Sequence, residues 1–379
     1  MIKSSVDIGY QQCAQSLMDN IADPFIYFDE NGVSNYYYQY VEHAQQQNRI
    51  NENIKKSFND IINQIEAQGK ANQYNCIIGV SGGFDSSLLA YKAKDIGLRP
   101  LLVHFDNGWN AVESILNINN LTEKLQLDLY SVVVDWKEFK DLQFSYFKSG
   151  VVDIEAITDH AIIASLYQVA LKFGIKYILS GSNALTEFTL PNYWIWNKYD
   201  HINILDIHKR FGTIELSTYP LYDRILKKRV QFNGIKRIDL LNLLNVNPSE
   251  DKLFLKEKLN WIDFSGKHHE SVFTRFYQGY ILPQKFNIDK RKAHLSNLIF
   301  SGQLTKHKAI DMLACPTYDP DQLKLDKSFV LTKLELTEDW FDEWIKKDRV
   351  EHDVYRIEKS FWDSNFILKR MKFLRNLIH

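Results

Sequence analysis

The stretch CIIGVSGGFDSS, from Cys76 to Ser87, is an apolar run that breaks into two glycines and continues as a helical pattern. It predicts a buried strand, a tight turn and the start of a helix. Gly82 and Gly83 have no Cβ to hinder positive φ, so consecutive amides of the turn can face one anion, and the helix N-terminus adds to the attraction. The stretch therefore predicts a phosphate-binding turn.

The side chains around the glycines extend this prediction. Ser81, Ser86 and Ser87 supply hydroxyls, and Asp85 is placed to hold a Mg²⁺ ion that bridges phosphate oxygens. The turn is neither the G-x-x-x-x-G-K-[ST] loop nor the G-x-G-x-x-G dinucleotide turn. SGGFDS instead resembles the PP-loop of the ATP pyrophosphatase superfamily, whose members split ATP between the α and β phosphates. The resemblance implies ATP and Mg²⁺ as cofactors; the alternative is a Ser/Gly-rich turn that binds nothing.

The composition is that of an ordinary globular protein. The chain has 379 residues, of which 45% are hydrophobic and 25% charged, and a formal charge of -1. This balance disfavours a general nucleic-acid-binding surface. The three cysteines show no pairing pattern and the start has no apolar signal core, so we expect a cytoplasmic protein. The longest apolar stretch, near 161–171, is too short to span a membrane, so no membrane association is expected.

Residues 1–45 predict a small module of their own. Cys13, Ser16, Ser34 and Tyr37 have the spacing of a four-cysteine zinc knuckle, yet only the first is a cysteine. One thiolate, two serines and a tyrosine do not make a structural zinc site. We therefore predict a zinc-ribbon-like module without zinc, in which the tyrosines at 36–38 fill the vacated space; chance spacing is the alternative.

Three further segments follow this module. Residues 46–72 predict an amphipathic linker helix, residues 73–220 alternate strand and helix patterns, and residues 221–379 are mainly helical and would complete the active site. Apolar runs occur at 76–80, 101–105, 130–134 and 177–180, and helical patterns occur near 84–96, 110–125 and 154–173. This order predicts an α/β domain with a doubly wound parallel sheet, as in the adenine nucleotide alpha hydrolase-like PP-loop domains that SGGFDS resembles.

Ligands of such sheets bind beyond the carboxyl ends of the strands. Asp106 follows the second strand, where contact with ATP and a simple turn with Asn107 and Gly108 are alternatives. Gly181 lies in a small-residue loop after the fourth strand and is another predicted ATP contact. Predicted substrate contacts are Trp109, Asp159, His160, Asn183 and Glu187. For Asp159 and His160 a satisfied core pair is the alternative, and for Glu187 a surface turn.

A segment at 266–294 interleaves cations with aromatic residues. A solvated basic helix face is the usual explanation of such a run. As a set, however, Lys267, Arg275, Lys285 and Arg291 match what a pyrophosphate leaving group requires, and with Asp85 they are the predicted catalytic residues. His269 is a predicted substrate contact; its metal ligation is disfavoured because H-H-E is not H-E-x-x-H.

From the glycine turn onward the chain resembles the N-acetyl sugar amidotransferase family. The members of this family are PP-loop enzymes of bacterial surface-polysaccharide and nonulosonic-acid pathways. The matching stretches are VSGGFDS at 80–86, DNGW at 106–109, TDHA at 158–161, NALTEFTLP at 183–191, IHKRFG at 207–212 and residues 266–295. The resemblance implies conversion of a sugar acetamido group to an acetamidino group. The acetamido oxygen would attack the α-phosphate of ATP, giving an O-adenylated imidate and pyrophosphate, and ammonia would then displace AMP.

The ammonia is expected to come from other subunits. A built-in glutaminase needs a cysteine nucleophile on a sharp elbow or at the N-terminus, and Cys13, Cys76 and Cys315 lack that setting. The resemblance implies a separate glutaminase with a cyclase-like companion. Candidate contacts for these partners are Trp194, Trp196, Trp340 and Trp344. Two alternatives remain: a PP-loop tRNA-modifying enzyme, disfavoured by the scarcity of cysteine, and a non-catalytic scaffold, disfavoured by the intact SGGFDS.

Overall fold

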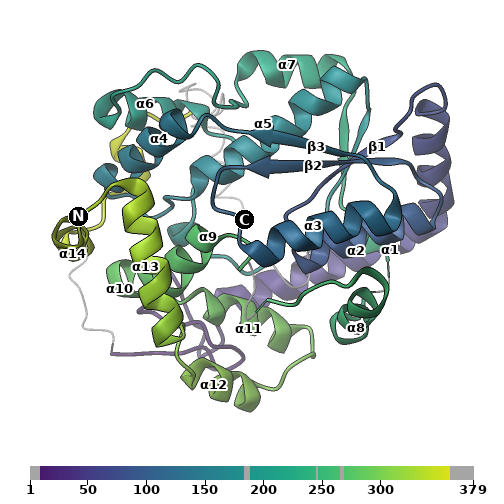
Figure 1. The fold of residues 1–379 in the computed structure, drawn as a ribbon. Helices are drawn as coiled ribbons and strands as arrows, with labels where there is room; N and C mark the ends of the chain where they lie inside the picture. Colours follow the sequence, from purple (N-terminus) through teal and green to yellow (C-terminus); the bar gives the residue numbers. More distant parts are fainter. Residues whose placement is uncertain (1–8, 183–187, 245, 265–268, 359–379) are drawn as a thin grey trace, which may run out of the picture.

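The computed structural model describes residues 9–182, 188–244, 246–264 and 269–358, and within 47–57 the backbone only. Its centre is a five-stranded parallel sheet in the order β3-β2-β1-β4-β5 (Figure 1). The strands are β1 (Cys76–Gly79), β2 (Pro100–Asp106), β3 (Leu129–Val133), β4 (Tyr177–Leu179) and β5 (Lys236–Ile238). The chain leaves β1 in one direction and returns to its other side at β4. This reversal confirms the predicted doubly wound α/β fold and puts its switch point between β1 and β4.

Helices cover both faces of the sheet. Helices α2 (Phe84–Asp95) and α3 (Val112–Leu125) lie together on one face, and α5 (Ala156–Phe173) and α7 (Arg224–Phe232) on the other (Figure 1). Because successive strand side chains point to opposite faces, Ile78 packs in the core under α2 while Ile77 packs against α5. β1, β2 and β4 are buried and read as continuous apolar runs, whereas β3 is a largely exposed edge strand that was visible in the sequence through its valines.

Two elements of this unit differ from the sequence-based expectation. The sheet extends past the expected limit at 220, because β5 at 236–238 pairs with β4. This strand is short and largely exposed at the sheet edge, so its sequence, Lys-Arg-Ile, carries no apolar signal. Helix α4 (Trp136–Ser149) was also missed; it begins at Asp135, whose side chain accepts from the amides of Lys137 and Glu138.

Most of the helical remainder forms one aromatic core with α4 and the start of α5. Its helices are α6 (His201–Phe211), α8 (Pro248–Leu259), α9 (Val272–Phe276), α10 (Leu282–Phe286), α11 (Lys290–Phe300), α12 (Lys306–Ala314), α13 (Pro320–Leu334) and α14 (Glu338–Lys346). Trp109, Trp194 and Trp344 are at most 2% exposed in this core. Trp109 was predicted to contact substrate and the other two to contact partners. Those predictions are wrong, because each indole N–H is satisfied internally, by Gln143, Ala22 and Phe147 respectively.

The N-terminal module keeps part of the predicted knuckle. Cys13, Ser16 and Ser34 are fully buried, and the Ser34 amide donates to Cys13 Sγ at 3.2 Å. Tyr37 lies elsewhere, edge-on to Phe300 of α11, with the ring centroids 5.6 Å apart. The hydroxyls of Tyr36 and Tyr38 donate to Asp23 and Asp29 respectively. That the tyrosines fill the knuckle stays a prediction. The module also has no boundary at 45, since α1 (Asn35–Gln68) runs through that position as one helix.

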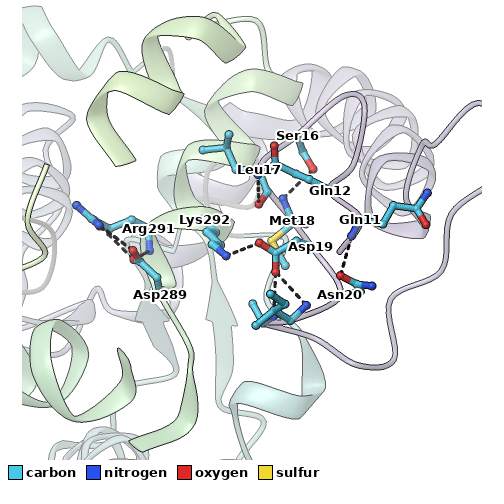
Figure 2. A network of polar contacts seen from close by, with 12 residues as sticks. Gln11, Gln12, Ser16, Leu17, Met18, Asp19, Asn20, Asp289, Arg291 and Lys292 are labelled. Atoms are coloured by element: carbon cyan, nitrogen blue, oxygen red, sulfur yellow. Dashed lines mark hydrogen bonds and ion pairs between the residues drawn. The ribbon is translucent and has the colours of Figure 1, made fainter. Parts of the chain in front are cut away.

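Polar contacts attach this module to the helical region. Figure 2 shows Lys292 of α11 paired with Asp19, and the Leu17 amide also donates to Ser296 Oγ at 3.1 Å. Lys306 of α12 donates to the Cys13 carbonyl at 2.7 Å. Asp19 is fully buried, so its pairing with Lys292 removes the cost of an isolated buried charge. The module is thus packed against α11 and α12 as part of the same body.

No helix within the described residues is both long and apolar enough to cross a membrane.

Candidate active site

A cavity of about 530 Å³ opens at the switch point, beyond the carboxyl ends of β1, β2 and β4. Three parts of the chain form its walls. The sheet contributes Gly79–Ser81, His104, Phe105, Ser180–Ser182 and Arg237; the segment leading into α5 contributes Asp153, Glu155, Thr158 and Asp159; the helical region contributes Glu270, Ser271, Thr274, Gln278 and Lys290. The cavity therefore joins the glycine turn to residues far away in the sequence.

The glycine turn has the predicted positive φ at Gly82 but not at Gly83, whose φ is -72°. Gly82 has φ +77°, and a Cβ there would lie 2.4 Å from the Ser114 carbonyl oxygen, so only glycine fits. The Gly82 carbonyl accepts from Asn117 Nδ2 and Trp261 Nε1, both at 3.0 Å, and the Ser81 carbonyl accepts from Ser114 Oγ at 2.6 Å. The Ser81 and Gly82 carbonyls thus accept hydrogen bonds from α3 and Trp261. The amides in the first turn of α2 are therefore the backbone groups that can bind an anion.

The three serines of the turn differ in position. Ser81 is exposed and lines the cavity, and its Oγ accepts from the Gly83 amide at 3.3 Å. Ser86 Oγ lies within the turn, donating to the Gly83 carbonyl at 3.2 Å. Ser87 is fully buried, and its hydroxyl has no partner among the described residues. The prediction that Ser87 contacts ATP is therefore corrected: one step along α2 turns its side chain from the cavity towards the sheet.

Two carboxylates lie beside the turn. A Cβ on Gly83 would fall 1.8 Å from Glu270 Oε1, so this carboxylate lies directly over the turn. Asp85 lies between the turn and the β4 loop, since a Cβ on Gly181 would be 3.4 Å from Asp85 Cβ. Gly181 also lines the cavity, as predicted for an ATP contact.

This donor set fits Mg²⁺ shared with phosphate. Mg²⁺ usually takes one or two carboxylates and completes its shell with water and substrate phosphates. Among the described residues no three histidine, cysteine or acidic side chains are grouped as ligands, so a metal cage made by the protein alone is not formed there. Asp85 and Glu270 beside the glycine turn are two carboxylates of the kind that a phosphate-bound Mg²⁺ takes.

Glu270 reaches the turn through a contact between distant segments. The Ala111 amide donates to the Glu270 carbonyl at 2.9 Å and the Val272 amide donates to the Trp109 carbonyl at 2.8 Å. Asp106 supports the same segment as a turn residue: Oδ1 accepts from the Gly108 amide at 2.8 Å and from Asn110 Nδ2 at 2.9 Å. Of the two alternatives for Asp106, the structure thus contains the turn, and Asp106 is not among the described residues that line the cavity.

A partly buried lysine with two acids forms the opposite wall. Lys198 Nζ pairs with Asp153 at 2.7 Å and with Asp159 at 2.8 Å. Burial acts to raise the pKa of Asp153, but the Lys198 ammonium holds that pKa below its usual value. Asp159, a predicted substrate contact, is half exposed on the cavity wall.

His160 positions this group rather than touching a ligand. Its Nε2 accepts from the Tyr222 amide at 2.9 Å, so Nδ1 carries the proton and donates to the Lys198 carbonyl at 2.8 Å. Burial lowers the pKa of His160 to about 4, so the ring stays neutral. The predicted substrate contact by His160 is therefore corrected to the satisfied core alternative. Sequence reasoning missed Asp153, Glu155 and Lys198, although two acids in the apolar run VVDIEAI were a usable signal.

The predicted cation set is not assembled at the cavity. Arg275 forms a two-point ion pair with buried Asp326 at 2.6 and 3.0 Å. Lys285 donates to the Trp344 and Lys347 carbonyls at the end of α14, and Arg291 donates to the Cys315 carbonyl after α12. All three stabilise the helical region: Arg275 neutralises a buried carboxylate, and Lys285 and Arg291 satisfy carbonyls at helix ends. Their catalytic assignment is wrong for this structure.

Other predicted residues lie off the cavity or outside the described residues. His269 is beside the Arg275–Asp326 pair, and burial lowers the pKa of its ring to about 4. It is not among the described residues that line the cavity, so the predicted substrate contact by His269 is not supported. Lys267, Asn183 and Glu187 lie outside the described residues.

Lys290 is the cation from this segment that does line the cavity. Helix α11 begins with three cations: Arg291 pairs with Asp289 and Lys292 with Asp19 (Figure 2). Lys290 makes no ion pair or hydrogen bond with any residue that the structure describes. Adjacent helical residues are about 100° apart, so Lys290 and Arg291 face different surroundings. A cation at a helix N-terminus is opposed by the helix dipole, so Lys290 is placed against its local preference.

Comparisons with known proteins cover parts of this chain. Residues 270–371 match the sequence model of a family described as "LPS biosynthesis protein WbpG-like, C-terminal domain". A stretch of 131 residues is 31% identical to an uncharacterized protein of Methanocaldococcus jannaschii. It covers 34% of this chain and 45% of that protein, so the chain spans less than half the length of this curated relative.

Three solved structures are similar to this chain at low identity. An NMN synthetase from Francisella tularensis is 14% identical, covers 77% of this chain and 97% of its own, and has a TM-score of 0.33. An NH3-dependent NAD synthetase from Campylobacter jejuni is 16% identical over 56% and 93%, with a TM-score of 0.28. The U34-tRNA thiolase NcsA from Methanococcus maripaludis is 13% identical over 64% and 78%, with a TM-score of 0.32. The sheet order and strand register define the fold independently of these likenesses.

Proposed function

We propose that this protein is an ATP-dependent amidotransferase that converts the acetamido group of a bacterial surface sugar to an acetamidino group. The observation that carries the proposal is the single cavity shared by the glycine turn and the Asp153–Lys198–Asp159 wall. At about 530 Å³ it is within the range of small-molecule sites. One wall offers amides to phosphate, and the other offers carboxylates, an ammonium and hydroxyls that suit sugar hydroxyl and amide groups.

The ATP half of the reaction rests on the glycine turn. The amides of α2's first turn would hold the pyrophosphate part of ATP, and Asp85 with Glu270 would hold Mg²⁺, which supplies charge neutralisation at the phosphates when bound. Lys290 takes the part that the sequence assigned to Arg275, Lys285 and Arg291: it neutralises charge that grows as pyrophosphate leaves. No nucleophilic side chain is needed, so catalysis here is positioning and electrostatics.

The sugar half rests on the helical region and the acid–lysine wall. The acetamido oxygen would attack the α-phosphorus, forming a C–O–P linkage as pyrophosphate departs with the electron pair of the broken P–O bond. Support for a surface-polysaccharide substrate comes from the family match at 270–371, because that segment provides Glu270, Ser271, Thr274, Gln278 and Lys290 to the cavity.

Oxygen transfer tests this function directly. Acetamido sugars, free and nucleotide-linked, are prepared with oxygen-18 in the acetamido carbonyl and incubated with the protein, ATP, Mg²⁺ and ammonium chloride. We expect AMP to carry the oxygen-18, because its phosphate gains the former amide oxygen. Mass spectrometry of AMP is the measurement, and unlabelled sugar in oxygen-18 water is the control, which should give unlabelled AMP. Production of ADP and phosphate, or of unlabelled AMP from a labelled sugar that is converted, would show that the mechanism is wrong.

We further propose that ammonia reaches this site from a separate glutaminase with a cyclase-like companion. Cys76 is fully buried in β1, and Cys13 is fully buried among serines. Cys315 is exposed, but it follows α12 and its thiol lies 3.6 Å from the Asp311 carbonyl, without a general base in that contact. None of the three has the setting of a glutaminase nucleophile.

The purified chain is therefore expected to form product with concentrated ammonium at alkaline pH but not with glutamine. Product formation is followed by mass spectrometry, with both nitrogen sources at equal concentration. A triple variant with Cys13, Cys76 and Cys315 replaced by alanine is the control, and it should use ammonium like the parent if it folds. Turnover of glutamine by the isolated chain that is lost in this variant would show that a cysteine nucleophile is present after all.

A further inference from the structure

Glu155 is the buried carboxylate of the cavity wall that has no part in the steps above. It directly precedes α5 and is 8% exposed. Thr274 Oγ1 of α9 donates to Glu155 Oε1 at 2.5 Å, which joins two segments 119 residues apart. In the described part of the chain Oε2 has no hydrogen-bond partner, although the residue lines the cavity. Oε2 is not one of the fully buried unpaired atoms of the described residues, so it is open to the cavity and available to a ligand there.

The charges around Glu155 indicate which kind of ligand fits. The groups acting on it are Asp153 and Asp159 from its own segment and Lys290 from α11. Lys198 is bound between the two aspartates. With Glu155 ionised, three carboxylates face two ammonium groups, so the wall retains one negative charge. An anion would be repelled there, whereas a small monocation that donates hydrogen bonds would be held.

The proposed reaction consumes such a cation. Ammonia in neutral water is mostly ammonium, which has no free electron pair and cannot attack the adenylated carbon. We propose that Glu155 binds the incoming ammonium ion through Oε2 and accepts one of its protons, so that ammonia is formed beside the activated acetamido group. This inference rests on the proposed function and adds to it the site of the nitrogen substrate.

Protons and electron pairs are conserved in this step. One proton passes from ammonium to the Glu155 carboxylate, and the nitrogen electron pair forms a C–N bond to the imidate carbon. The C–O bond to AMP then breaks, and AMP leaves with its electron pair. The new nitrogen loses a second proton to the departing phosphate or to water, and the product is the amidinium form of the sugar.

The acidity of Glu155 suits this role. Burial raises the pKa of its carboxyl to about 7, against the Thr274 hydrogen bond and Lys290, which lower it. A base is most effective when its pKa is near the working pH. Below about pH 7 the protonated carboxyl can no longer accept a proton, so ammonium use should fall as pH falls through this value.

The test separates the two halves of the reaction in the full-length protein. In E155Q, we expect ammonium-dependent amidine formation to fall about 100-fold, while sugar-dependent exchange between ATP and labelled pyrophosphate falls only a few-fold. Hydroxylamine, which is largely neutral at pH 7 and needs no base, should be used by E155Q at close to the parental rate. E113Q, the same change at an exposed position of α3, is the matched control.

A second variant distinguishes loss of the base from misfolding and tests the pKa of Glu155. Thr274→Val removes the hydrogen bond that stabilises ionised Glu155. The acid limb of the pH–rate profile with ammonium should therefore move to higher pH than in the parent protein, while the pH–rate profile with hydroxylamine should not move. E155Q with parental ammonium kinetics, or equal losses with ammonium and hydroxylamine, would overturn the inference. If the parent protein shows no pyrophosphate exchange with any acetamido sugar, the proposed function fails and this inference with it.

Discussion

Asp85→Ala should reduce sugar-dependent pyrophosphate release about 10³-fold or more while leaving the fold intact. Asp85 lies in the first turn of α2 beside the glycine turn and the β4 loop, where its carboxylate would hold Mg²⁺ against the phosphates. Its removal also withdraws a negative charge from a helix N-terminus, which costs only about 0.3–1 kcal/mol of stability. The measurement pairs initial rates of pyrophosphate release with thermal unfolding.

The matched control for Asp85 is on the same helix. Asp95→Ala changes an exposed acid at the other end of α2, where a negative charge is opposed by the helix dipole. This variant should keep the parental rate and at least the parental Tm. Pyrophosphate release by Asp85→Ala within tenfold of the parent, at saturating Mg²⁺, would remove Asp85 from the site.

Lys290→Gln and Arg291→Gln should have opposite effects although the residues are neighbours. Loss of Lys290 should lower kcat/KM for adenylation about 10²–10³-fold with little change in Tm, since Lys290 lines the cavity and has no ion pair with the described residues. Loss of Arg291 removes its pairing with Asp289 and its bond to the Cys315 carbonyl, which should cost about 1–3 kcal/mol of stability.

The folded fraction of Arg291→Gln should adenylate sugar at close to the parental rate. The two variants are compared by urea unfolding and by the exchange of labelled pyrophosphate into ATP, which reports adenylation without the ammonia step. Lys290→Arg serves as a second control, because it keeps the positive charge and should retain more activity than Lys290→Gln. A large loss of exchange in Arg291→Gln that is not matched by unfolding would return the catalytic role to Arg291.

The central unit was predictable because its signals are local. A strand buried on both faces must be apolar throughout, and a turn with φ +77° at Gly82 against the Ser114 carbonyl must be glycine. The apolar strand and the two glycines both lie within twelve residues, from Cys76 to Ser87. The parallel arrangement follows from the alternation of strands and helices, because parallel strands require crossover connections, whereas the strand order comes from the structure. β5 was missed because Lys-Arg-Ile contains no apolar run, whereas β3, the other edge strand, was found through Val132 and Val133.

The active-site assignments depended on contacts that composition and spacing do not contain. The cations of the segment at 266–294 look equivalent in the sequence, but their roles differ because Arg275 meets Asp326, Lys285 meets the end of α14, and Lys290 meets the cavity. The hydrogen-bond partner of Glu155 is Thr274, which lies 119 residues away in the sequence. The sequence by itself thus determined the glycine turn and the parallel strands, because each is encoded in consecutive residues. Tertiary structure alone decided which charges face the ligand, because helix phase and distant partners determine whether a charged side chain is satisfied internally or left for the cavity.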